Sequence, residues 1–218
     1  MVEAVSEAME PLKPRLRGWL HAGMFPASLI AGLTLIWLAR TPQTALACGI
    51  YSASAWLLFG TSAVYHRGAW GPRGEAVLRR LDHANIFVII AGTYTPLTVL
   101  LIPQHRRGLL LGLVWTGALA GVAFRVLWVG APRWLYTPCY LVLGWSAVFL
   151  LPDFMHVGGV AVVTLIVVGG VLYTAGAVVY GTQRPDPSPR WFGFHEVFHT
   201  FTVAAFTTHY AAIALAAV

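Results

Sequence analysis

The chain has 218 residues, of which 58% are apolar and only 10% are charged, and its formal net charge is +6. Globular domains in solution carry roughly a quarter charged residues, so this balance excludes that class and indicates an integral membrane protein. Membrane topology and anionic lipid account for the basic excess, and no nucleic-acid partner is needed to explain it.

Seven apolar runs follow a polar leader, residues 1–18, which is expected to lie in the cytoplasm. The runs lie at about 19–39, 44–65, 84–102, 108–130, 134–151, 157–181 and 194–217. Most are long enough for the ~20 residues with which a helix crosses a bilayer, and none keeps the alternation of a barrel strand. The sequence predicts an all-α integral membrane protein in which residues 19–218 form a single seven-helix transmembrane domain.

The distribution of basic residues predicts how this bundle is oriented. If the N-terminus is cytoplasmic, ten Lys or Arg residues fall on that side, and only Arg40, Arg106 and Arg107 fall on the other. Cytoplasmic loops of membrane proteins carry such an excess of positive charge. We therefore expect a multi-pass protein of the plasma membrane with its N-terminus inside and its C-terminus outside.

Ionisable residues within membrane spans are costly and often mark functional sites. His66 ends the second run, Asp82 begins the third, and His195 and His199 begin the seventh, so all four are expected at the cytoplasmic end. His195 and His199 are four residues apart and share a helix face, as do Ser62 and His66. Three imidazoles and one water are a common set of ligands for catalytic zinc. We expect Zn²⁺ at His66, His195 and His199, with Asp82 as the proton acceptor and Ser62 in support. The plainer alternative is that these histidines contact lipid headgroups or helix ends.

The segment FHEVFH also contains H-E-x-x-H, which in soluble metalloproteases supplies two zinc ligands and a glutamate base. Glu196 lies about 100° around the helix from His195, which turns it away from a shared metal. No histidine follows His199 at the spacing of a third protease ligand, and no acid follows Glu196. The protease interpretation is therefore disfavoured, and Glu196 is expected to face lipid headgroups or the loop before the last helix.

Taken together, SAVYH, the aspartate of RLDHANIF, AGTYTP and HEVFH resemble the motifs of the hemolysin III family. Its members are bacterial relatives of the progestin and adipoQ (adiponectin) receptors, within the wider alkaline ceramidase-like group of membrane hydrolases. The resemblance implies a seven-helix bundle with its N-terminus inside. It also implies zinc held by His66, His195 and His199, with Asp82 beside the metal water and Ser62 in support.

Besides these three, the chain has five further histidines. His21 begins the first helix at the same cytoplasmic level, and it is expected either to cap or hydrogen-bond a neighbour or to support the metal as an alternative fourth ligand. His83 is expected at the membrane interface. His105, His156 and His209 lie toward the outer side, and no site is assigned to them.

The favoured function is a zinc-dependent hydrolase that cleaves an amide or ester bond of a membrane lipid. One alternative is a non-enzymatic sensor with structural zinc. Another is a cytolytic activity, which the family's name suggests, but no amphipathic pore-forming segment supports it. A retinal protein is excluded because the only lysine, Lys13, is far from the last helix. A b-type haem held by two histidines remains open. A membrane lipid is the expected partner, as substrate or ligand.

Overall fold

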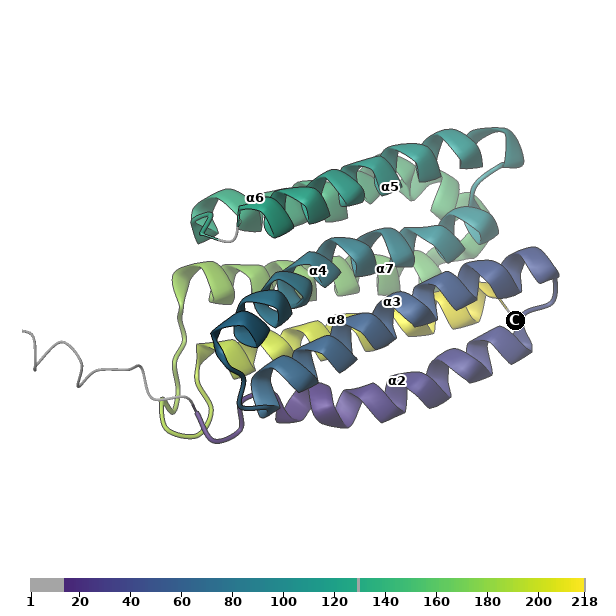
Figure 1. Ribbon diagram of the computed structural model, residues 1–218. Helices are drawn as coiled ribbons and strands as arrows, with labels where there is room; N and C mark the ends of the chain where they lie inside the picture. Colours follow the sequence, from purple (N-terminus) through teal and green to yellow (C-terminus); the bar gives the residue numbers. More distant parts are fainter. Residues whose placement is uncertain (1–13, 129, 218) are drawn as a thin grey trace, which may run out of the picture.

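The chain folds as an all-helical bundle in the computed structural model, which describes residues 14–128 and 130–217 (Figure 1). Most of the predicted leader, including Lys13, lies outside these residues. The elements in chain order are α2 (Trp19–Leu38), α3 (Pro42–Arg67), α4 (Pro72–Leu101), α5 (Gln104–Leu127), α6 (Arg133–Trp145), the 3₁₀ helix η1 (Ser146–Leu150), α7 (Leu151–Thr182) and α8 (Phe194–Ala217). The described residues contain no strand beyond one isolated bridge. The all-α class is confirmed.

Helix starts follow local sequence signals. α3 begins after Thr41, whose hydroxyl accepts a hydrogen bond from the backbone N–H of Thr44 at 3.1 Å, and Pro42 occupies its first turn. Pro72 likewise opens α4. A threonine cap satisfies one of the free N–H groups at a helix start, and proline fits there because its missing N–H is not needed.

Six helical stretches in the described part of the chain are long and apolar enough to cross a membrane. Five of them correspond to predicted runs. The sixth, Arg133–Thr182, covers the two runs predicted at 134–151 and 157–181. The loop expected between those runs is wrong, because α7 already begins at Leu151 with a proline in its first turn. The irregular backbone lies instead in η1 and at Gly159, whose φ of 71° suits glycine.

The chain reverses direction within this sixth stretch. The hydroxyls of Tyr136 and Tyr180 lie 3.0 Å apart, and the indole N–H of Trp145 donates to the hydroxyl of Thr174 at 2.8 Å. These pairs join early residues of the stretch to late ones. α6 therefore lies antiparallel to the second part of α7, and the two do not form one continuous rod.

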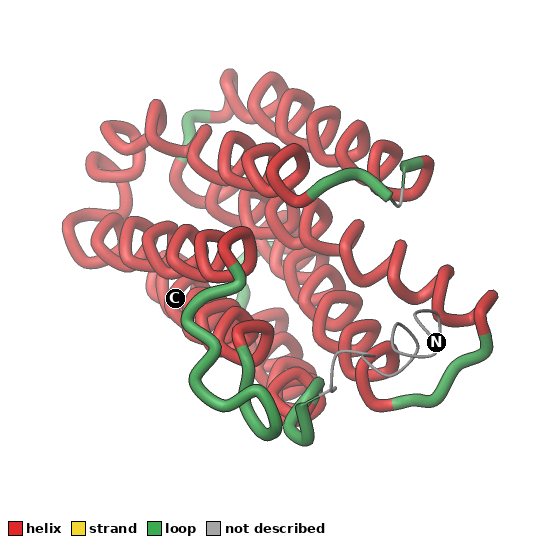
Figure 2. The backbone as a smooth tube through the Cα atoms, turned by 90° about the vertical axis from the view of Figure 1, so that its left-hand side faces the viewer, coloured by secondary structure: helices red, strands yellow, loops and turns green. Residues whose placement is uncertain are grey.

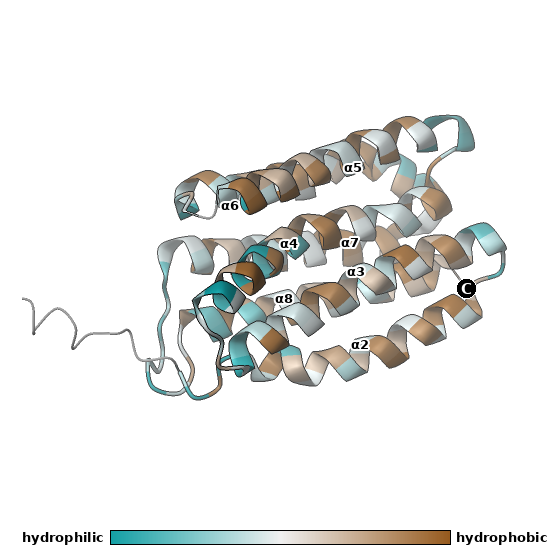
Figure 3. Ribbon diagram, viewed as in Figure 1, coloured by the Kyte–Doolittle hydropathy of each residue, from teal (hydrophilic) through white to brown (hydrophobic). Residues whose placement is uncertain are grey.

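The helices pack in a bundle in which α8 contacts α2, α4 and α7. Figure 2 views this bundle from the end at which the long loop between α7 and α8 lies. Large apolar side chains such as Ile30, Leu113 and Leu127 are exposed on its outside, and hydrophilic residues gather at the start of α4 (Figure 3). An apolar outer surface suits contact with lipid.

The segment before α2 crosses the end of the bundle that carries the starts of α4 and α8. The backbone N–H of Arg15 donates to the carbonyl of Arg190 at 3.0 Å, and that of Leu16 donates to the carbonyl of Trp191 at 3.1 Å. Gly18 has a φ of 82°, and a Cβ there would lie only 2.6 Å from the Cβ of His66. This glycine thus lets the segment pass directly beneath the end of α3.

Candidate metal centre

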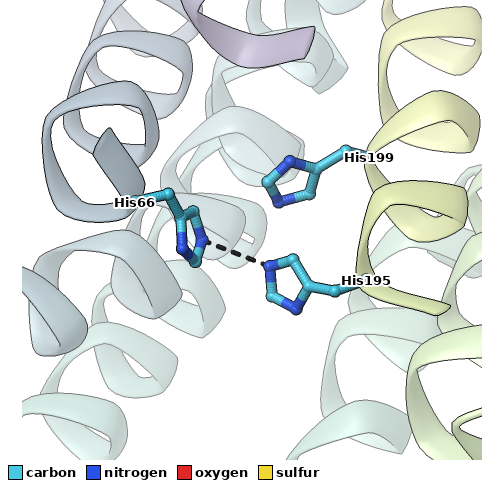
Figure 4. Close-up of side chains that lie close together, drawn as sticks. All are labelled: His66, His195 and His199. Atoms are coloured by element: carbon cyan, nitrogen blue, oxygen red, sulfur yellow. Dashed lines mark hydrogen bonds between the residues drawn. The ribbon is translucent and has the colours of Figure 1, made fainter. Parts of the chain in front are cut away.

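Three histidines converge at this end of the bundle (Figure 4). His66 lies in the last turn of α3, and His195 and His199 lie in the first two turns of α8. One ring nitrogen from each lies within 4.8 Å of the other two, and the Nε2 atoms of His66 and His195 are 3.2 Å apart. The structure therefore brings together the three residues expected to bind the metal.

The first turn of α8 is fixed by two carboxylates. Glu196, the third residue of the helix, accepts a hydrogen bond from the backbone N–H of Gly193 at 2.8 Å. Asp186 accepts one from the N–H of Phe194, also at 2.8 Å. Both bonds satisfy free N–H groups at the helix start. The backbone that carries His195 and His199 is thereby held in place.

The three imidazoles fit a divalent metal ion. His66 and His199 are buried, with 6% and 2% of their surface exposed, and the Nδ1 atom of His199 has no hydrogen-bond partner. Neither Cys48 nor Cys139 belongs to the cluster. A set of neutral imidazoles suits zinc, copper, iron or nickel, and three protein ligands with one open position are typical of catalytic zinc.

Asp82 and Ser62 adjoin this cluster, as the sequence predicted. Asp82 projects from α4, and its Oδ2 atom lies 3.7 Å from the Nε2 atom of His66. Ser62 is buried one turn before His66, next to Asp82. Both residues line the same cavity as His199. A carboxylate and a hydroxyl are therefore available beside the three histidines.

A long, mostly apolar cavity begins at this cluster and continues between α4, α6, α7 and α8. His199 and His209 both line it, and they are ten residues apart on α8, which corresponds to about 15 Å along the helix axis. Its far part is bounded by Leu97, Val148 and Leu151. The shape and composition suit a hydrocarbon chain.

A second, polar hollow is lined by Arg17, Tyr65, His66, Gly68, Trp70 and Glu75. His66 thus borders a polar hollow, and His199 borders the apolar cavity.

The structure contradicts one of the two surroundings predicted for the side chain of Glu196. It is buried, with 1% of its surface exposed, and forms an ion pair with Arg17 in addition to its bond to Gly193. The expected contact with lipid headgroups is wrong, because the segment before α2 covers this side chain; the expected contact with the loop before α8 is confirmed. Its position as the third residue of the helix was the sequence signal for this capping role.

His83 contacts two groups of the protein, and its predicted position at the membrane interface stays a prediction. Its Nδ1 atom lies 2.8 Å from the carbonyl of Arg79, and its Nε2 atom lies 3.0 Å from the hydroxyl of Tyr180. A carbonyl only accepts, so Nδ1 carries the hydrogen and Nε2 accepts from Tyr180. Tyr180 lines the cavity and contacts the ring of His195. Sequence reasoning missed Tyr180, since a tyrosine at a helix end gives no distinguishing signal.

His21 and His209 also lie in the cavity wall. His209 was assigned no site, and its Nε2 atom lies 3.1 Å from the carbonyl of Ile166. His21 is buried and stacks on the ring of His199, with centroids 3.7 Å apart. Neither ring nitrogen of His21 has a hydrogen-bond partner among the described residues. The expectation that it caps a helix or hydrogen-bonds a neighbour is therefore wrong.

Comparison with known proteins places the chain in a family. The family described as Haemolysin-III related matches residues 9–210. Over 164 residues the chain is 30% identical to Hemolysin-3 of Bacillus cereus, which covers 75% of this chain and 71% of that protein. Over 155 residues it is 33% identical to a Hemolysin-3 homolog of Bacillus subtilis, covering 71% of this chain and 69% of that protein. Together with its apolar helices, these matches show that the chain is a multi-pass membrane protein that belongs to the haemolysin-III related family.

Proposed function

We propose that this protein is a zinc-dependent hydrolase that cleaves an amide or ester bond of a membrane lipid. The observation that carries the proposal is the position of three imidazoles and a carboxylate at one end of an apolar cavity inside a membrane bundle. A lipid can place its hydrocarbon chain in this cavity and its carbonyl group at the histidines. In this proposal, water reaches the histidines from the polar hollow that His66 lines.

Each residue of the site has its own role in the proposed reaction. His66, His195 and His199 would hold the zinc ion, which supplies a Lewis acid that polarises the lipid carbonyl and makes water more acidic. Asp82 accepts a proton from the water that attacks the carbonyl carbon. The bond from that carbon to nitrogen or oxygen then breaks, and Asp82 returns the proton to the leaving amine or alcohol. Ser62, next to Asp82, orients the carboxylate for both transfers.

For the topology we propose seven crossings, with the N-terminus and the histidine cluster on the cytoplasmic side. The reversal between α6 and the second part of α7 supports counting two crossings in Arg133–Thr182. The positive charge on the side of the N-terminus supports the orientation. A reporter fused after Val218 is expected to be active only outside the cytoplasm. A cytoplasmic reporter would contradict the orientation and the stated depth of the site.

The main alternative is a sensor or scaffold in which zinc has a structural role. It is favoured by the fact that the metal would tie α3 to α8, which carry ligands 129 residues apart. A cytolytic activity is suggested by the names of the family and of the two Bacillus relatives, and by no feature of the site. These alternatives require zinc or membrane insertion, but no turnover of lipid.

Turnover of a defined lipid tests the hydrolase directly. The full chain in lipid nanodiscs is supplied with an N-palmitoyl sphingoid base, or with a palmitoyl ester, and released palmitate is measured. Release should stop when a chelator removes zinc and return when zinc is restored, because the ion supplies the Lewis acid. If the zinc-loaded protein releases no palmitate from either lipid class, the structural role replaces the enzymatic one.

A further inference from the structure

His21 is a buried polar side chain to which the proposed reaction assigns no role. It lies in the first turn of α2 and has 2% of its surface exposed. One face of its ring stacks on His199 with an angle of 6° between the planes, and Phe59 packs edge-on at 5.1 Å. The same side chain lines the apolar cavity beside Ser62 and Asp82.

Both ring nitrogens of His21 lack a hydrogen-bond partner among the described residues. A neutral imidazole has one N–H donor and one acceptor, and leaving both unpaired in a buried position is costly. Phenylalanine would fill the same space without that cost. A polar ring at this position is therefore suited to a group that enters the cavity.

His21 is not placed to share a metal ion with His199. The lone pair of an imidazole nitrogen lies in the plane of the ring, so two ligands of one ion must have planes that meet near it. The rings of His21 and His199 are stacked almost parallel, with their centroids 3.7 Å apart. Their planes do not converge, and this arrangement disfavours the expectation of an alternative fourth ligand.

One other donor beside the cluster is already committed. The hydroxyl of Tyr180 donates to the Nε2 atom of His83, because Nδ1 of that ring must donate to a carbonyl. The hydroxyl of Ser62 has no hydrogen-bond partner among the described residues, but it lies next to Asp82, whose carboxylate is available to accept from it. An ionised carboxylate only accepts. His21 thus has an N–H that contacts the cluster and has no acceptor.

We propose that His21 binds the polar head of the lipid by donating its N–H to the carbonyl oxygen of the amide or ester. This inference rests on the proposed function, since it requires a lipid in the cavity. It makes His21 a determinant of specificity, which distinguishes a lipid with a carbonyl next to its chain from a plain hydrocarbon of equal length.

The test compares two probes on the full zinc-loaded protein in detergent micelles: N-methylpalmitamide and heptadecane. In His21→Phe the ring that packs on His199 and Phe59 is kept and the N–H is lost. We expect the zinc content and melting temperature to stay near those of the wild type. The dissociation constant of the amide should rise on the order of tenfold, the effect of one lost hydrogen bond, whereas that of heptadecane should not change.

Two further variants make the comparison specific. His21→Gln retains an N–H donor and should bind the amide more tightly than His21→Phe, which a role in packing alone does not predict. Thr98→Val serves as the matched control, because the Thr98 hydroxyl is also buried and unpaired among the described residues but does not line the cavity. We expect it to leave both affinities unchanged.

The outcomes separate this inference from the proposed function. If the wild type binds neither probe, the lipid cavity and the proposed function are wrong, and the inference fails with them. If the wild type binds the amide and His21→Phe binds it equally well, only the role of His21 is wrong. Loss of zinc from both His21→Phe and His21→Gln would also overturn the proposal, since His21 would then belong to the metal site.

Discussion

Replacing His195 and His199 together by alanine is expected to abolish zinc binding and to lower the melting temperature of the purified protein. A single imidazole, that of His66, would remain of the three that converge. A metal that binds only the folded state stabilises it by about 4 kcal/mol when its concentration is a thousand times the dissociation constant. The drop in melting temperature should be large here, because the ion would join α3 to α8.

Elemental analysis and thermal unfolding in the presence and absence of a chelator check this prediction. The exposed His105 provides a control, and His105→Ala should keep both the metal and the melting temperature. The chelator should destabilise the wild type and the control but not the double variant. Full zinc occupancy in the double variant would show that the ion is held elsewhere.

Asp82→Asn is expected to retain zinc and to lose hydrolysis of lipid. The three imidazoles remain, but an amide cannot accept the proton of the attacking water. The asparagine has almost the shape of the aspartate, so the cavity beside His66 should be preserved. Zinc content and release of palmitate measured on the same preparation test both parts. A variant that keeps its zinc and its full rate would remove Asp82 from the chemistry.

Glu196→Gln should differ from Asp82→Asn in its hydrolytic activity. It is expected to keep both zinc and hydrolysis but to unfold more readily, by about 1–3 kcal/mol, because Arg17 loses its buried partner. In a metalloprotease of the H-E-x-x-H type this glutamate is the base, and its replacement would abolish activity. An inactive Glu196→Gln beside an active Asp82→Asn would therefore favour the protease mechanism.

The membrane class and most helices could be predicted from the sequence, because long apolar runs between short polar connections allow few alternatives. The approach of His66, His195 and His199 could also be predicted. Two of them are four residues apart, and all three lie at helix ends of the same depth. The break within Arg133–Thr182 could not be placed, since residues 152–156, which separate the two predicted runs, are helical.

The remaining contacts depend on how each helix is rotated about its own axis. The stacking of His21 on His199, the bond from Tyr180 to His83 and the ion pair of Arg17 with Glu196 join residues that are far apart in the sequence. Helical periodicity indicates which residues share a face, but it does not say which neighbouring helix that face meets. Helices in a membrane are expected to be apolar on most sides, so their hydrophobic pattern gives little indication of which face is buried against a neighbour.

X-ray absorption at the zinc edge of the purified wild-type protein identifies the atoms bound to the metal. We expect a zinc ion with three imidazole nitrogens, and a spectrum that loses one imidazole, or the metal itself, in His66→Ala. A spectrum dominated by sulfur or carboxylate ligands, or one unchanged in His66→Ala, would contradict this expectation.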